Sequence, residues 1–146
     1  MKAVISVDDT VKFHFDVDGE NFSSAGEASI IMKKSLRQLG FPQNVIRRVT
    51  IAMYEGEINM VIHANGGQAD VEISPDEIKI VLEDSGPGIA DVDLAMQEGY
   101  STAKDNIRAL GFGAGMGLPN MKKYTDSMEI ETEIGVGTKI TMTVKT

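Results

Sequence analysis

Five short segments of the chain alternate between apolar and polar residues, which is the pattern of strands that bury one face. In residues 128–133, for example, every second residue is a glutamate, and methionine, isoleucine and threonine lie between them. Strands of this kind are typical of an antiparallel sheet that exposes one face to water and covers the other with helices. The five predicted strands span residues 11–17, 69–74, 77–83, 128–133 and 139–145.

Three further segments carry the signals of α-helices. The first spans residues 25–39, with a serine as its expected N-cap and Gly40 as its stop. The second starts near Pro42 and runs to about Ala64, where the pair Gly66-Gly67 is expected to end it. The third starts at Leu118-Pro119, because proline is well tolerated in the first turn of a helix.

These elements predict an α/β protein of the two-layer α+β sandwich type. We expect a mixed, largely antiparallel sheet that three helices cover on one face. The chain has 146 residues without repeats, low-complexity tracts or a linker, so residues 1–146 are expected to form a single domain.

The chain is acidic and contains no cysteine, with 22 Asp and Glu residues against 14 Lys and Arg residues and a net charge of −8. A nucleic acid partner is not expected, because neutralising its phosphates needs clustered Lys and Arg side chains. A bound nucleotide is still compatible with this charge, since backbone dipoles can hold phosphates. The chain has no disulfide framework, no signal-like start and no run of about 18 apolar residues, so we expect a cytoplasmic protein without membrane contact.

Residues 85–117 show neither the alternation of a strand nor the spacing of a helix, and only residues 91–98 could form a short helix. A loop of this length in a compact domain is usually functional. Its last part, GFGAGMG at residues 111–117, leads directly into the third helix. Backbone N–H groups at such a helix start suit a phosphate. A Rossmann fingerprint is not indicated because no strand precedes the glycines, and the Walker lysine pattern is absent.

Polar residues recur at intervals of four in the second helix, at Glu55, Asn59 and His63. This spacing places them along one helix face. A carboxylate and a carboxamide one turn apart suit a hard cation such as Mg²⁺, although a solvent-facing polar stripe has the same spacing. Gly56 costs about 1 kcal/mol relative to alanine in a helix, which close approach of a backbone or ligand would explain, as would simple tolerance.

A second polar motif, DSGPG, follows the predicted strand 77–83 and begins with Asp84. A carboxylate at a strand end can accept a hydrogen bond from an amine, and Gly86 and Gly88 would let a planar group approach the backbone. The same five residues are also simply a good turn sequence.

Four motifs together resemble the boxes of the GHKL ATPase superfamily, whose members, among them gyrase, histidine kinases and anti-sigma serine kinases, share the Bergerat nucleotide-binding fold. They occur in that family's order, and the resemblance runs from about residue 25 to residue 145. The motifs are ExxxN from Glu55 to Asn59, DxGxG from Asp84 to Gly88, GxGxG from Gly113 to Gly117, and GxGT from Gly135 to Thr138.

The resemblance implies a role for each motif. Glu55 matches the family's general base, and Asn59 would hold Mg²⁺ against the phosphates of ATP or ADP. Asp84 would bind the adenine amino group, Thr138 would lie near the adenine edge, and residues 90–113 would form a lid. The full set expected to contact nucleotide is Asn59, His63, Asp84, Gly86, Gly88, Ile89, Ser101, Thr102, Lys104, Arg108, Gly113, Gly115, Met116, Gly117, Leu118 and Thr138.

Within the superfamily, EGYSTA at residues 98–103 and GAGMGLP at residues 113–119 are similar to small anti-sigma regulatory kinases of the RsbT/RsbW type. This likeness implies an ATP-dependent serine/threonine protein kinase that acts on a small STAS-type antagonist. Phosphoryl transfer depends mainly on positioning and charge stabilisation, so a cationic group is expected near Glu55. Lys104 and Arg108 are the candidates, although both also fit as solvent-facing charges.

Two other functions stay open at this stage. One is a non-catalytic module that binds a sigma factor or other partner and uses nucleotide as a switch, because a nucleotide site does not prove transfer. The other is the ATP-binding half of a histidine kinase, which is disfavoured because the only histidines are His14 and His63. His63 is expected to be structural or to lie at the ligand's edge, and a homodimer is compatible with the resemblance.

Overall fold

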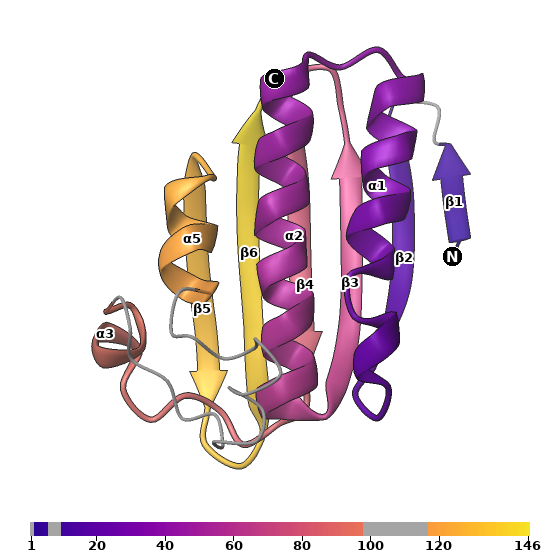
Figure 1. Cartoon of the computed structure of the whole chain (residues 1–146). Coiled ribbons are helices and arrows are strands. Elements are labelled where there is room, and N and C mark those ends of the chain that lie inside the picture. Colours follow the sequence, from indigo (N-terminus) through magenta and orange to yellow (C-terminus); the bar gives the residue numbers. More distant parts are fainter. Residues whose placement is uncertain (1, 6–9, 98–116) are drawn as a thin grey trace.

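The computed structural model describes residues 2–5, 10–97 and 117–146. These residues form a two-layer α+β sandwich in which three helices lie side by side over one face of a six-stranded sheet (Figure 1). The strands are β1 (Lys2–Ile5), β2 (Val11–Asp18), β3 (Gly66–Ile73), β4 (Glu77–Asp84), β5 (Ser127–Glu133) and β6 (Gly137–Lys145). The helices are the 3₁₀ turn η1 (Phe22–Ser24), α1 (Glu27–Gln38), α2 (Gln43–Ala64), α3 (Val92–Ala95) and α5 (Gly117–Lys123).

The sheet has the order β1-β2-β3-β4-β6-β5, and every described pair of neighbouring strands is antiparallel. The expected two-layer fold is therefore confirmed, and the sheet is more regular than the mixed sheet that the sequence predicts. The edge strand β1 was not predicted, because four residues are too few to show a clear alternation.

Alternation along each strand separates a dry face from a wet one. Phe13 and Phe15 on β2 are buried, whereas Lys12 and Asp16 on either side of this pair are exposed. On β5 the three glutamates of the sequence pattern are exposed, as predicted. The dry face packs against α1, α2 and α5, so the helical layer and the sheet enclose one core.

The long helix α2 runs along the strands over the middle of the sheet (Figure 1). Val49, Ala52 and Met53 on its inner side are completely buried. Full burial of a side chain of this size stabilises the fold by about 1.5–3 kcal/mol relative to exposure. Within the described residues, no helix is both long and apolar enough to cross a membrane.

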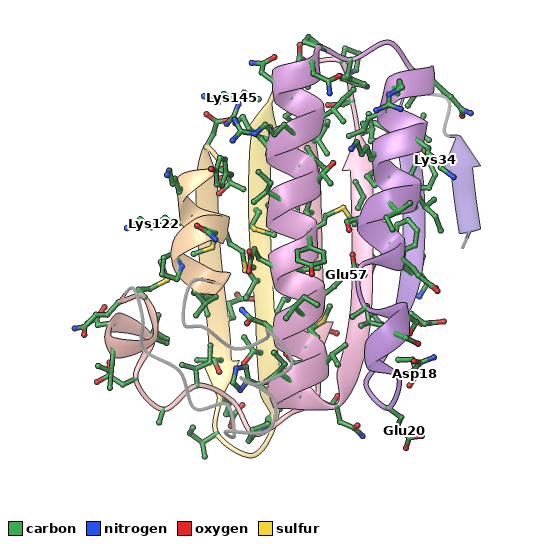
Figure 2. The ribbon with its side chains drawn as sticks, viewed as in Figure 1. Asp18, Glu20, Lys34, Glu57, Lys122 and Lys145 are labelled. Atoms are coloured by element: carbon green, nitrogen blue, oxygen red, sulfur yellow. The ribbon has the colours of Figure 1, made fainter. Side chains whose placement is uncertain are left out.

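The start of α1 differs from the expected serine cap. Its N-cap is Gly26 in the left-handed region (φ 96°), and no side chain from α1 itself caps the helix. Instead, the carboxylate of Glu57 on α2 accepts N–H bonds from Gly26 (2.9 Å), Ala28 (3.3 Å) and Ser29 (2.8 Å). Figure 2 shows Glu57 between the two helices. One buried carboxylate thereby satisfies three of the N–H groups that a helix start leaves unpaired.

The burial of Glu57 has an electrostatic consequence. The side chain is 2% exposed. Desolvation raises the pKa of Glu57, while the backbone N–H groups of Ser29, Gly26 and Ala28 act in the opposite direction. The sequence did not single out this residue, because its partners are about thirty positions away in another helix.

The end of α2 also differs in detail from the expectation. The helix stops at Ala64, and Asn65 adopts the left-handed conformation (φ 57°) that closes it. Gly66 and Gly67, expected to end the helix, are instead the first residues of β3. By contrast, Gly40 (φ 82°) ends α1 as predicted, with the Gly40 and Phe41 N–H groups bonded to the carbonyls of Arg37 and Leu36.

Candidate functional site

Asp84 lies at the end of β4, directly opposite Thr138 of β6. Its Oδ1 atom accepts hydrogen bonds from the backbone N–H of Gly86 (2.9 Å) and of Thr138 (3.2 Å). Both bonds hold one carboxylate oxygen, and in the part of the chain that the structure describes Oδ2 accepts none. The half-buried carboxylate is therefore oriented by the backbone and keeps one oxygen for a donor such as an amine.

Thr138 joins a small hydroxyl network beside Asp84. Its Oγ1 lies 2.9 Å from Oγ1 of Thr132 on β5, and Thr132 accepts the N–H of Ile89 at 2.9 Å. This network ties the DSGPG turn to the ends of β5 and β6. Thr132 was not among the predicted site residues, although the inward position on its strand and its place opposite Thr138 would have identified it.

The glycines of the DSGPG turn lie against neighbouring backbone. A Cβ atom at Gly86 would lie 2.6 Å from Cβ of Ala64, and one at Gly88 would lie 2.6 Å from the carbonyl oxygen of Glu133. Gly88 also has a left-handed φ of 81°. Larger residues would push this turn away from the ends of α2 and β5, so the glycines hold the turn close to Asp84.

Glu55, Asn59 and His63 lie along one side of α2, and each is half-buried. A purely solvent-facing stripe does not describe these positions. Gly56 beside them is buried, and a Cβ there would collide with the side chain of Leu82 on β4. The side chain of Leu82 therefore accounts for Gly56, rather than the expected approach of a backbone or ligand or a simple tolerance for glycine.

His63 lies at the end of this stripe nearest the Gly86 turn. Burial lowers the pKa of the His63 imidazole from its ordinary value of 6.5. The ring is consequently neutral at pH 7, which suits a residue at a ligand's edge better than a cationic contact to phosphate.

The short helix α5 packs against the side of α2 that carries Glu55 and Asn59. A Cβ at Gly117 would lie 2.7 Å from Nδ2 and 2.8 Å from Oδ1 of Asn59. Asn59 Nδ2 also lies 3.9 Å from the sulfur of Met121, and the amide of Asn120 donates to Oε1 of Glu55 at 3.3 Å. The residue that ends the predicted phosphate segment thus touches the residue predicted to hold Mg²⁺.

The far end of α5 is anchored to α2 by Arg48. Its Nη2 atom pairs with Oδ2 of Asp126 at 2.7 Å, and its Nε donates to the carbonyl of Tyr124 at 3.2 Å. The backbone N–H of Lys145 and the guanidinium of Arg48 lower the pKa of Asp126. Contacts at both of its ends therefore determine how α5 lies on α2.

The structure describes only part of the remaining predicted site. Within the described residues, no three His, Asp or Glu side chains gather in a way that could hold a metal ion. Ile89 lies in the turn after Gly88, and Leu118 of α5 is buried in the core. The predicted residues outside the described ranges are Ser101, Thr102, Lys104, Arg108, Gly113, Gly115 and Met116, together with most of the expected lid.

The described residues thus include members of all four predicted motifs in one candidate site. Asp84 and Thr138 form one end of the site, and Glu55 and Asn59 form the other, with the last glycine of the third motif beside Asn59. The arrangement offers an oriented acceptor for an amine, a carboxamide oxygen for a hard cation, and a half-buried carboxylate able to accept a proton.

Comparisons with known proteins identify a family and several related chains. The family described as histidine kinase-, DNA gyrase B-, and HSP90-like ATPase matches residues 44–146. The chain is 34% identical over 108 residues to the serine/threonine-protein kinase RsbT of Bacillus subtilis (strain 168), covering 71% of this chain and 75% of the relative. It is 28% identical over 142 residues to the anti-sigma F factor of Clostridium beijerinckii, covering 93% and 92%.

Solved structures share the fold. The RsbU and RsbW domains of a Mycobacterium tuberculosis protein superpose with a TM-score of 0.62 at 16% identity, covering 91% of this chain and 32% of that chain. This chain therefore spans about a third of that solved chain. The mycobacterial sensor histidine kinase MprB superposes with a TM-score of 0.52 at 15% identity, covering 91% and 96%. These likenesses concern the fold.

Proposed function

Because the chain belongs to the family of histidine kinase-, DNA gyrase B- and HSP90-like ATPases, we propose that it is an ATP-dependent serine/threonine protein kinase that regulates a small protein partner. The observation that carries the proposal is the meeting of α2 and α5. There the predicted base Glu55 and the predicted metal ligand Asn59 lie beside the residue that ends the glycine-rich segment. ATP binding follows from the family, and the transfer step depends on Glu55.

The adenine end of the site depends on Asp84. We propose that its Oδ2 accepts the exocyclic amine of adenine, since the backbone N–H groups of Gly86 and Thr138 already hold Oδ1. The glycines of the turn let it pack closely on α2 and β5, which keeps the backbone donors beside Asp84. A carboxylate held by two N–H bonds needs little reorganisation to bind, so its orientation adds to affinity.

The phosphate end depends on Asn59. Its carboxamide oxygen is a suitable ligand for Mg²⁺, which usually takes one or two protein ligands and fills its remaining positions with phosphate oxygens and water. A site with few protein ligands agrees with the lack of an acidic cluster among the described residues. When bound, Mg²⁺ and ATP supply the transferable phosphoryl group and part of the charge that stabilises its transfer.

Glu55 is proposed to accept the proton of the attacking hydroxyl. A partner serine or threonine oxygen would form the new bond to phosphorus, and its proton would pass to the Glu55 carboxylate as ADP leaves. Glu55 is only half-buried, so part of its side chain remains exposed. Lys104 and Arg108, predicted in the lid of residues 90–113, remain the candidates for a cation that stabilises the transferred group.

We propose a STAS-type antagonist as the protein that carries this hydroxyl, on the resemblance to small anti-sigma regulatory kinases; the relatives are named a serine/threonine kinase and an anti-sigma factor. The test is transfer of labelled phosphate from ATP to such a partner by the wild type and by Glu55→Gln. We expect the variant to bind ATP normally and to transfer about 10²–10⁴-fold more slowly, which is the usual contribution of a general base. Unchanged transfer by the variant would remove Glu55 from the mechanism.

The names of several relatives support a second candidate function. Proteins that match nearly the whole chain are named anti-sigma F factors, so the chain could regulate a sigma factor by binding it. Nucleotide-dependent binding of a sigma factor without any phosphate transfer to a partner would favour this alternative. The transfer assay above therefore separates the two functions.

A further inference from the structure

One face of α5 is directed at the site. Gly117, Asn120 and Met121 are spaced i, i+3 and i+4, so they lie on the same side of the helix. Each of them meets α2: Gly117 at Asn59, Asn120 at Glu55, and Met121 at both Gly56 and Asn59. Met121 is completely buried, so this face has a defined position on α2.

Asn120 is the polar member of this face. Its Nδ2 atom donates to Oε1 of Glu55 at 3.3 Å, and both residues are half-buried. Among the described residues, Oε2 of Glu55 accepts no hydrogen bond. Asn120 therefore holds one oxygen of the carboxylate and leaves the other for a proton donor.

We infer that Asn120 is a positioning residue for Glu55, and this inference rests on the function proposed above. A glutamate side chain has three rotatable bonds, and a single hydrogen bond from a neighbouring helix restricts them. Asparagine is neutral, so it orients the carboxylate without forming the ion pair that a lysine or arginine would form. Such orientation matters because a displacement of about 1 Å can cost 10²-fold in rate.

The inference also connects Glu55 with the glycine-rich segment that is proposed to hold the triphosphate. The helix that carries Asn120 begins at Gly117, where the glycine-rich segment proposed to hold the triphosphate ends. Any movement of α5 on nucleotide binding therefore also displaces the Asn120 amide, which is the hydrogen-bond donor to Glu55. Arg48 restrains the far end of the helix through Tyr124 and Asp126.

The first test needs no turnover. The side-chain NH₂ signals of Asn120 are followed by ¹⁵N NMR while the pH is lowered, in the wild type and in Glu55→Gln. A donor to a carboxylate senses its protonation, so we expect the Asn120 signals to titrate in the wild type and to stay constant in the variant. Signals that behave alike in both proteins would overturn the inference, whatever the chain catalyses.

The second test measures the effect on chemistry, with Mg·ATP as the probe and water as the acceptor of the phosphoryl group. In this reaction the water oxygen bonds to the γ-phosphorus, the bond to the bridging oxygen breaks, and the proton passes to Glu55 as ADP leaves. We expect Asn120→Ala to lower kcat by about 10- to 100-fold. The KM for ATP should stay within about 2-fold of the wild type, because Asn120 positions the base and does not bind substrate.

Two further variants separate positioning from a merely structural contact. Asn120→Asp places a second carboxylate beside Glu55, and we expect the acidic limb of the pH–rate profile to move to higher pH. Lys122→Ala changes an exposed residue of the same helix and should alter neither kcat nor the profile. An unchanged kcat in Asn120→Ala, or an equal loss in Lys122→Ala, would contradict the assigned role.

The outcomes also distinguish this inference from the proposed function. A wild-type chain that binds ATP but never releases phosphate to water or to a partner would refute the kinase proposal. In that case the NMR titration would still decide whether Asn120 holds Glu55. A normal wild-type rate together with an unaffected Asn120→Ala variant would refute only the positioning role.

Discussion

Replacement of Gly117 by alanine tests whether α5 and Asn59 form one site. The added Cβ would lie 2.7 Å from Nδ2 and 2.8 Å from Oδ1 of Asn59, whereas ordinary contact begins at 3.4 Å. The carboxamide must therefore retreat by roughly 0.6 Å, and the sulfur of Met121, 3.9 Å from Nδ2, limits that movement. Overpacking of this kind costs about 1–3 kcal/mol.

The cost should appear in nucleotide affinity as well as in stability. If Asn59 holds Mg²⁺ against the phosphates, its displacement should weaken Mg·ATP binding by about tenfold or more, since each 1.4 kcal/mol corresponds to a factor of ten. Isothermal titration measures the affinity, and urea unfolding measures the stability of each variant. Lys122→Ala, on the exposed side of the same helix, is the control that should change neither.

A double-mutant cycle identifies the source of the penalty. In the Asn59→Ala background the carboxamide is gone, so Gly117→Ala should no longer be destabilising. It should gain up to about 1 kcal/mol from the better helix propensity of alanine. An equal loss of stability in both backgrounds would show that the clash lies elsewhere and would refute the contact between these residues.

Two predictions concern the scaffold. Glu57→Ala leaves three N–H groups at the start of α1 without their acceptor, so we expect urea unfolding to show a loss of stability of about 3 kcal/mol or more. The control Glu27→Ala changes an exposed residue and should have little effect on stability. Similar small losses in both variants would contradict the capping role. Hydrogen bonds to Asp70 and Asp16 raise the pKa of His14 above 6.5, so its stabilisation is complete below that pH and is lost as the pH rises through the raised value. The wild type should therefore lose up to about 1 kcal/mol between pH 6 and pH 9 relative to His14→Gln, and parallel curves would refute the pairing.

Much of this fold is visible in the sequence because its strands have one wet face. The alternating glutamates of β5 and the helical spacing around Met53 identify their elements without knowledge of any tertiary contact. The family resemblance is confirmed by the comparisons. The assigned roles of the individual site residues remain predictions.

What the sequence could not reveal depends on contacts between distant elements. The cap of α1 comes from Glu57, and no local signal pairs a glutamate in one helix with the start of another. The meeting of Asn120 with Glu55 likewise depends on how α5 lies across α2, which packing in the core decides. The reason for Gly56 in the middle of α2 is likewise a distant contact, because the side chain of Leu82 on β4 occupies the space that a larger residue would need.

The central claim is that Asp84 and the neighbouring motifs form an adenine nucleotide site. Isothermal titration of ATP and ADP, with and without Mg²⁺, into the wild type and Asp84→Asn tests it most directly. We expect both nucleotides to bind the wild type, ATP more tightly with Mg²⁺, and Asp84→Asn to weaken binding by about 10- to 100-fold through loss of a hydrogen bond to a charged group. Failure of the wild type to bind either nucleotide, or equal affinity in the variant, would contradict the claim.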